Sequence, residues 1–184
     1  MSMRAFVAIE VPAQVLDSLV VAQKELSSTG ADLKLVERVN LHFTVKFLGE
    51  ISETKARDAD ARLKELQLKS AKVEVRGIGV FSPSRPRVVW AGVPREHEGL
   101  ISLIARSVID ALRGIGEEDD RQFQPHITLA RVRSVRNIRE LKDAIGMNAS
   151  RPFGSVEINS LTLKSSQLTP SGPVYSDVGV YQLK

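Results

Sequence analysis

The chain has 184 residues, of which 42% are hydrophobic and 26% are charged. At about 150 residues per domain, this length fits one globular unit or two small packed lobes, and the composition excludes disordered and low-complexity chains. Lys and Arg number 26 and Asp and Glu number 22, so the net charge is +4, which mildly favours anionic partners.

Cysteine is absent, which excludes disulfides, cysteine nucleophiles and thiolate metal sites. No stretch approaches the roughly 18 apolar residues that a membrane-spanning helix needs. Glu10 and Pro12 interrupt the first apolar run before it could become a signal peptide. We therefore expect a soluble, cytoplasmic protein that makes no contact with a membrane.

In the first half of the chain, strands and helices are predicted to alternate. Residues 4–11 form a β-rich run that ends at Pro12, which favours a strand. From 13 to 27, apolar residues recur every three or four positions, as on one face of a helix. The same criteria predict a strand over 41–47, a helix over 52–66 and a strand over 71–81.

The second half repeats this order. It predicts a strand over 87–93, a helix over 100–112, a strand over 125–132, a helix over 137–145, a strand over 155–164, and a turn with one last strand within 169–184.

Matching positions indicate that the chain contains an internal duplication. Phe6 precedes His42, and Trp90 precedes His126, by 36 residues in each case, and the segments VEV at 73–75 and VEI at 156–158 match at an offset of 83. We predict a single domain over 1–184. Its halves, approximately 1–83 and 84–184, should face each other around a pseudo-two-fold axis, with a cleft where they meet.

Two of the three histidines occur in the same short pattern, HFTV from His42 and HITL from His126. Because side chains alternate along a strand, each histidine should share one face with the threonine two residues later, Thr44 or Thr128. If the halves pack symmetrically, two imidazoles and two hydroxyls surround one point in the cleft.

This set of side chains suits displacement at phosphorus. One neutral imidazole can act as a general base and one protonated imidazole as a general acid, so activity should follow a bell-shaped pH profile around neutrality. The threonine hydroxyls can donate hydrogen bonds to phosphate oxygens. A zinc site is the alternative use of paired histidines, but neither motif has a carboxylate at ligand spacing, so no metal is predicted. We expect His97 to be a solvated surface residue.

The segments LHFTVKFLGE and FQPHITLARV, which carry the two motifs, resemble the two-histidine phosphoesterase superfamily. The resemblance is to its LigT-like branch, named 2'-5' RNA ligase or RNA 2',3'-cyclic phosphodiesterase, and it covers essentially the whole chain. It implies a bilobal α+β fold, in which two antiparallel sheets with outer helices surround a central groove. The family needs no metal and no cofactor.

The resemblance also implies roles for the motif residues. His126 would be the proton acceptor that activates water against a 2',3'-cyclic phosphate, and His42 would be the proton donor to the departing 3'-oxygen, which leaves a 2'-phosphomonoester. Thr44 and Thr128 would bind the phosphate oxygens. The implied partners are RNA ends or nucleotides that bear the cyclic phosphate, including tRNA fragments.

Other residues near the motifs are weaker candidates. Arg131 is predicted to bind the substrate phosphate, although a strand end rich in arginine is often only a solvated edge. Strict alternation places Lys46 on the face of His42 and Thr44. Four aromatic residues are candidates for base stacking, although an aromatic residue in a strand is more often part of the core: Phe47, Phe81, Phe123 and Tyr175.

Three functions remain open at this point. The first is hydrolysis of 2',3'-cyclic phosphate ends, the second is 2'-5' ligation of RNA halves such as tRNA fragments, and the third is RNA binding without chemistry. A monomer is the simplest expectation, because the chain would complete its own two-fold arrangement.

Overall fold

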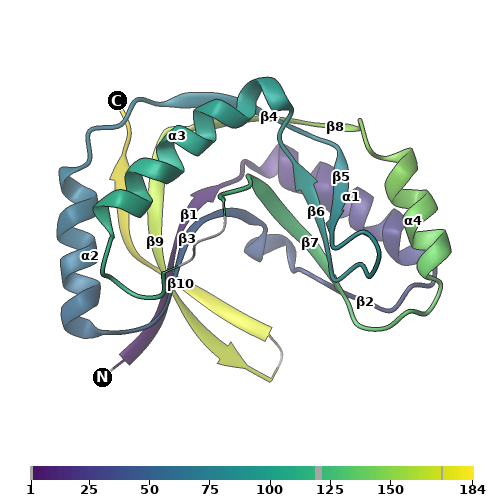
Figure 1. Cartoon of the computed structure of the whole chain (residues 1–184), viewed down its shortest axis with the longest axis horizontal. Helices are drawn as coiled ribbons and strands as arrows, with labels where there is room; N and C mark the ends of the chain where they lie inside the picture. Colours follow the sequence, from purple (N-terminus) through teal and green to yellow (C-terminus); the bar gives the residue numbers. More distant parts are fainter. Residues whose placement is uncertain (1, 119–121, 171) are drawn as a thin grey trace.

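One long antiparallel sheet crosses the molecule, and four helices lie outside it (Figure 1). The computed structural model describes residues 2–118, 122–170 and 172–184, and the elements below are those of these residues. In chain order they are β1 (Ser2–Glu10), α1 (Ala13–Ser28), β2 (Leu33–Leu35), the 3-10 helix η1 (Arg38–Asn40), β3 (His42–Ser52), α2 (Glu53–Glu65), β4 (Ala71–Arg76), β5 (Ile78–Phe81), β6 (Val88–Gly92), α3 (Arg95–Ala111), β7 (His126–Val132), α4 (Ile138–Met147), β8 (Pro152–Ile158), β9 (Ser160–Thr169) and β10 (Gly172–Gln182).

The strand order in the large sheet is β10-β9-β1-β3-β7-β6-β5, with β2 paired to β7, while β4 and β8 form a separate two-stranded sheet. All pairings are antiparallel. The predicted α+β class with two antiparallel sheets and outer helices is therefore confirmed. The sheets do not divide as one per half, because the large sheet takes strands from both halves of the chain.

Two predicted strands are in fact two strands each. The segment 71–81 splits at Gly77, whose φ of 79° turns the chain from β4 in the small sheet to β5 in the large one. The segment 155–164 splits at Asn159 into β8 and β9, again in different sheets. Hydropathy alternation is the same on both sides of such a corner, so the pattern alone could not show that the chain changes sheets.

The helices follow their predicted apolar faces. Helix α1 buries Val15, Leu19 and Leu26, and Ser52 caps α2 because its hydroxyl accepts a hydrogen bond of 3.3 Å from the backbone N–H of Lys55. Helix α3 begins at Arg95, five residues earlier than predicted. Its first turn is polar, so the apolar repeat did not reveal it.

The two halves pair through positions that the predicted duplication would make equivalent. Strands β3 and β7 pair at Phe43 and Ile127, the residues that follow the two motif histidines. In the small sheet, Val73 pairs with Val156, which the matching segments also align. Residues that pair with their own counterparts are what a two-fold axis requires. The pairing supports the predicted duplication, which stays a proposal.

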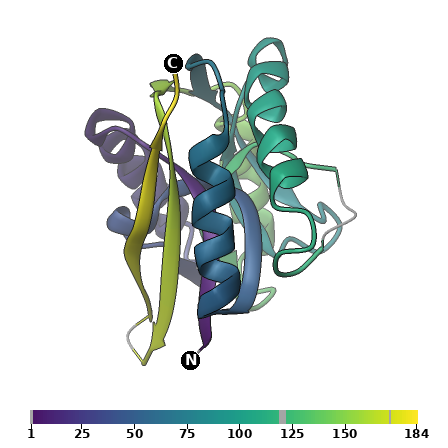
Figure 2. The same cartoon turned by 90° about the vertical axis from the view of Figure 1, so that its left-hand side faces the viewer.

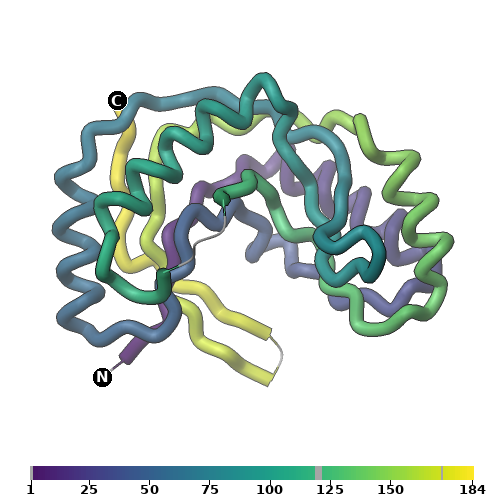
Figure 3. The backbone as a smooth tube through the Cα atoms, viewed as in Figure 1, coloured from purple at the N-terminus to yellow at the C-terminus, as the bar shows by residue number. Residues whose placement is uncertain are grey.

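The first helix of each half packs against elements of the other half. Helix α1 packs against β7, β8 and α4, all from the second half, and α3 packs against β3, β4 and α2, all from the first. Figures 1 and 3 show α1 beside α4 at one end of the molecule and α3 beside α2 at the other, and the quarter-turned view keeps α2 and α3 neighbours (Figure 2). This exchange holds the halves together, so we expect neither half to fold alone.

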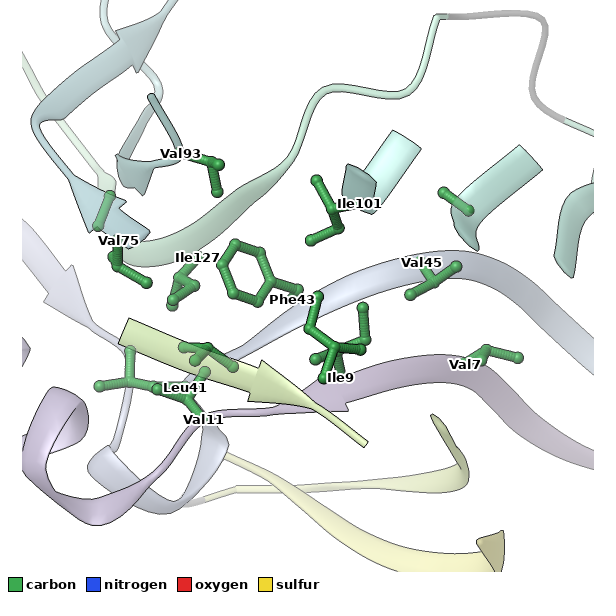
Figure 4. Packing of buried hydrophobic residues seen from close by; sticks show 14 of the residues in the cluster. Val7, Ile9, Val11, Leu41, Phe43, Val45, Val75, Val93, Ile101 and Ile127 are labelled. Carbon is green, nitrogen blue, oxygen red and sulfur yellow. The ribbon is translucent and has the colours of Figure 1, made fainter. Parts of the chain in front are cut away.

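The core is continuous across the junction between β3 and β7. Phe43 and Ile127 are fully buried and lie next to each other in the middle of the cluster, with Ile101 from α3 above them (Figure 4). Burial of one such side chain stabilises the fold by about 1.5–3 kcal/mol. The residues that flank this pair are consequently held on a rigid support. Among the described residues, no helix has the length and hydrophobicity that crossing a bilayer demands.

Candidate active site between the two motif strands

The two motifs meet at the point where β3 and β7 pair. The sheet face opposite the buried pair Phe43 and Ile127 carries the neighbouring residues His42 and Thr44 from β3, and His126 and Thr128 from β7. All four are half-buried, whereas the residues between them are buried. The structure therefore brings together the four side chains that the sequence predicted to share one site.

A groove of about 290 Å³ opens over this point. Its walls include His42, Thr44, Thr128 and Arg131, four of the five predicted site residues. The other wall residues come from the segment around β2 and η1 and from the start of β10: Lys34, Leu35, Val36, Glu37, Asn40, Gly172, Pro173 and Tyr175. His126 is not among the wall residues and lies beside the groove. The Asn40 side chain donates a hydrogen bond of 3.2 Å to the Pro173 carbonyl, which ties these two walls together.

His42 is enclosed by aromatic rings. The Phe6 ring stacks on it at 5.0 Å between centroids, and the Tyr175 ring meets it edge-on at 5.6 Å. Its Nε2 lies 3.1 Å from the Thr44 hydroxyl. Burial lowers the pKa of His42 to about 4, against the opposing effects of the Asn40 backbone and the Glu10 carboxylate. His42 is consequently neutral in the unliganded protein at neutral pH.

His126 has a less enclosed position. The Phe81 ring meets it edge-on at 4.8 Å, and burial lowers its pKa while a hydrogen bond with the Gln124 backbone opposes this. Its Nδ1 lies 2.7 Å from the Gln124 carbonyl, which can only accept, so Nδ1 carries the hydrogen. In the neutral ring, Nε2 then has a free lone pair and can take a proton.

A β-bulge in each motif strand changes which side chains face the groove. The register between β6 and β7 passes from Thr128 to Ala130 and leaves Leu129 without a partner. The register between β1 and β3 leaves Val45, the equivalent residue, without one. An extra residue reverses the alternation beyond it. Arg131 therefore lines the groove, whereas strict alternation would have placed it on the core side.

The bulge at Val45 in β3 overturns the prediction for Lys46. This residue is buried, and its ammonium group lies 3.4 Å from the Glu117 carbonyl and 3.5 Å from the Glu118 carboxylate, so it is not a wall residue of the groove. Phe47 is partly exposed instead, with the Arg4 guanidinium 5.0 Å from its ring centre. Phe47 is the counterpart of Arg131, five residues after the motif histidine.

Gln23 is a positioning residue that the sequence analysis missed. Its side-chain amide donates hydrogen bonds of 2.7 Å and 2.8 Å to the carbonyls of Val36 and Leu129, and the N–H of Val36 donates to the same Leu129 carbonyl. Leu129 is the bulged residue, so Gln23 fixes the backbone that turns Arg131 into the groove. The available signal was a glutamine on the apolar face of α1, next to Leu19 and Leu26.

The remaining candidates take different places. His97 is half-buried on α3, and its Nδ1 accepts a hydrogen bond of 3.0 Å from the Glu74 backbone, so it supports structure and is less solvated than predicted. Phe81 and Tyr175 lie beside the two histidines, while Phe123 packs against the core. Among the residues that the structure describes, no three His, Asp or Glu side chains come close enough together to hold a metal ion.

Comparison with known proteins assigns the chain to a family. The model of the LigT-like phosphoesterase family matches two successive segments, 9–90 and 92–175. A protein from Archaeoglobus fulgidus named RNA 2',3'-cyclic phosphodiesterase is 38% identical over 98% of this chain and 100% of its own length. A protein of the same name from Methanothermobacter thermautotrophicus is 36% identical over all of both chains.

Solved structures share the fold. LigT from Escherichia coli, crystallised with 3'-AMP, superimposes with a TM-score of 0.79 over 100% of this chain and 99% of its own, at 24% identity. A protein from Thermus thermophilus superimposes with a TM-score of 0.77 over 98% of each chain, at 30% identity. Together with the two motifs that meet in one groove, these matches show that the chain belongs to the LigT-like phosphoesterase family.

Proposed function

We propose that the protein hydrolyses the 2',3'-cyclic phosphate at RNA ends to a 2'-phosphomonoester, as an RNA 2',3'-cyclic phosphodiesterase. The observation that carries this proposal is the convergence of the two His-x-Thr motifs around the paired residues Phe43 and Ile127. Relatives at 38% and 36% identity that bear this name support it. The reaction adds water across one P–O bond, so the two imidazoles supply the proton transfers that it needs.

In this proposal His126 is the general base. Because its Nδ1–H is held by the Gln124 carbonyl, its Nε2 is the nitrogen that takes a proton from the attacking water. The water oxygen forms the new bond to phosphorus. The lowered pKa of His126 keeps it neutral and ready to accept the proton over a wide pH range.

His42 is the general acid in this proposal. As the bond between phosphorus and the 3'-oxygen breaks, His42 gives its proton to that oxygen. The unliganded site disfavours the protonated ring because its surroundings are buried and aromatic. A bound phosphate anion favours the imidazolium through its negative charge. Substrate binding would therefore raise the pKa of His42, so that this ring carries a proton when the 3'-oxygen departs.

Thr44 and Thr128 are proposed to donate hydrogen bonds to the non-bridging phosphate oxygens, and Arg131 to add positive charge on the groove wall. These chain residues complete the chemistry without a metal or a cofactor. The substrates would include the ends of tRNA fragments. One chain carries both motifs, so a monomer suffices for the reaction. The cytoplasm is the proposed location.

The test is incubation of the purified protein, with EDTA present, with an oligoribonucleotide that ends in a 2',3'-cyclic phosphate. Wild type is compared with His42→Ala and His126→Ala, and His97→Ala is the control outside the groove. We expect a 2'-phosphate product and a loss of kcat/KM of about 10²–10⁴-fold in each motif variant. A 3'-phosphate product, or binding without turnover, would refute the proposal. Joined RNA halves in place of a hydrolysed end would favour the ligase alternative.

A further inference from the structure

Two positive side chains on neighbouring strands lie opposite each other in the wall of the groove. Lys34 on β2 and Arg131 on β7 are direct partners in the antiparallel register. Both are exposed, and both line the groove that holds His42, Thr44 and Thr128. Like charges directly opposite each other in a sheet destabilise the pairing, so this arrangement has a cost in the unliganded protein.

Nothing in the described part of the chain neutralises the pair. Neither side chain takes part in an ion pair or a hydrogen bond there, although Glu37 lines the same groove. Two hydrogen bonds support this arrangement. The Gln23 amide and the Val36 N–H both donate to the carbonyl of the bulged residue Leu129, and this bulge turns Arg131 toward Lys34. A bound anion would remove the repulsion.

The position of this pair separates it from the reacting phosphate. Arg131 lies beyond Thr128 along β7, and because Leu129 is bulged, these two residues are opposite Trp90 and Val88, which are two steps apart on β6. Two steps are about 7 Å of strand. The reacting phosphate of the proposed function lies at Thr44 and Thr128. In an RNA chain, the nearest other anion is the phosphodiester on the 5' side of the terminal ribose.

We propose that Lys34 and Arg131 form a second anion site, which binds the phosphodiester on the 5' side of the terminal nucleotide. This inference rests on the proposed function, because it takes the cyclic phosphate to lie at the motif threonines. It makes the enzyme selective for oligoribonucleotide ends over free cyclic mononucleotides, which lack that phosphodiester. It also makes the groove asymmetric, since the predicted duplication matches Arg131 with Phe47, which is uncharged and is not a wall residue of the groove.

The test compares adenosine 2',3'-cyclic phosphate with the dinucleotide ApA that ends in a 2',3'-cyclic phosphate, which has one more adenosine and the phosphodiester that joins it. The measured quantity is the ratio of kcat/KM for the dinucleotide to kcat/KM for the mononucleotide. Lys34→Gln removes the charge, Lys34→Arg retains it, and Lys69→Gln removes one charge from an exposed lysine outside the groove.

We expect Lys34→Gln to lower the ratio about fivefold to tenfold, as for the loss of one hydrogen bond of ordinary net strength. Lys34→Arg and Lys69→Gln should keep the wild-type ratio. The advantage of the dinucleotide should also shrink as salt increases, and less steeply in Lys34→Gln. A ratio that Lys34→Gln leaves unchanged would overturn the inference, as would an equal loss with both substrates.

A binding measurement separates this inference from the proposed function. Dissociation constants are measured for the two products, adenosine 2'-phosphate and ApA with a 2'-phosphate end, which needs no turnover. A lack of hydrolysis by wild type would refute the proposed function alone. The second anion site would still stand if ApA 2'-phosphate bound more tightly than the mononucleotide and Lys34→Gln abolished that difference, and it would fall if the difference persisted.

Discussion

The two motif strands, β3 and β7, carry the same motif and the same bulge, but they differ in the residues beyond the bulge. Both carry a histidine, a threonine two residues later and a bulge at the next position, Val45 or Leu129. Beyond the bulge, however, β3 presents Phe47, whereas β7 presents Arg131 opposite Lys34. The shared part gathers the reacting groups at one point. The unshared part places two positive side chains on the groove wall beside β7, whereas Phe47 on β3 is not a wall residue of the groove.

The two histidines differ in the same way. His42 lies between the rings of Phe6 and Tyr175, and its pKa falls to about 4. His126 meets one ring, Phe81, and has its pKa lowered less far. Identical side chains in matching positions therefore take on different proton affinities, because desolvation depends on what packs around each ring.

The largest effect that this comparison predicts is on the pH dependence of activity. If hydrolysis needs neutral His126 and protonated His42, the maximum of kcat/KM lies between their pKa values in the free enzyme. The lowered pKa values move it from neutrality to between about pH 4 and 6.5. Above this range, kcat/KM should fall about tenfold per pH unit. A flat profile, or a maximum above pH 7, would contradict catalysis by two histidines with lowered pKa values.

The second prediction concerns the pH dependence of stability. Because the folded state lowers the pKa of His42 from 6.5 to about 4, the unfolded chain binds the proton more readily between these values. The free energy of unfolding should be retained above about pH 6.5 and decrease by ~3 kcal/mol toward pH 4. Urea unfolding of His42→Gln should show a weaker pH dependence, and His126→Gln a smaller change than His42→Gln. Equal slopes for wild type and His42→Gln would argue against a buried neutral imidazole.

The third prediction concerns Gln23, whose side-chain amide supports the bulge at Leu129 in β7. Gln23→Met keeps the shape of the side chain but leaves the carbonyls of Val36 and Leu129 without this donor. We expect a loss of about 1–3 kcal/mol in the free energy of unfolding, measured by urea denaturation. The preference for the dinucleotide over the mononucleotide should also decrease, because Arg131 loses its support. A variant as stable as wild type, with its preference intact, would show that the bulge does not need this amide.

The smallest predicted effect is on the unliganded pair Lys34 and Arg131. Lys34→Gln should raise the free energy of unfolding by about 0.2–1 kcal/mol, because it removes the repulsion between opposite positions of β2 and β7. The gain should shrink at high salt, where the charges are screened. Thermal unfolding at low and high salt measures this, with Lys69→Gln as the control. A decrease in stability would indicate an attractive contact of Lys34 in the folded protein.

Much of the site was predictable because it depends on short patterns. The spacing of His42 and Thr44, repeated at His126 and Thr128, places these groups on one face of two strands whatever else the chain does. Arg131 was predicted from its charge, but its orientation depends on a bulge, which hydropathy alternation does not reveal. Lys46 was misplaced for the same reason.

Other features depend on contacts between distant segments. Tyr175 reaches His42 only because β9 and β10 return to pair beside β1. The pairing of Lys34 with Arg131 joins residues that no local pattern connects. The strand boundaries at Gly77 and Asn159 were missed because a chain that changes sheets keeps its alternation. The sequence therefore predicted the reacting groups better than the walls around them.

The division of the two motif histidines into one acid and one base can be tested directly by NMR. Both rings are titrated with and without a bound oligoribonucleotide that ends in a 2'-phosphate. We predict that both rings of the free protein titrate below 6.5, that His42 is the lower of the two at about 4, and that the bound phosphate raises the pKa of His42 more than that of His126. Two rings that titrate together near 6.5, with no response of His42 to the phosphate, would contradict the division into one acid and one base.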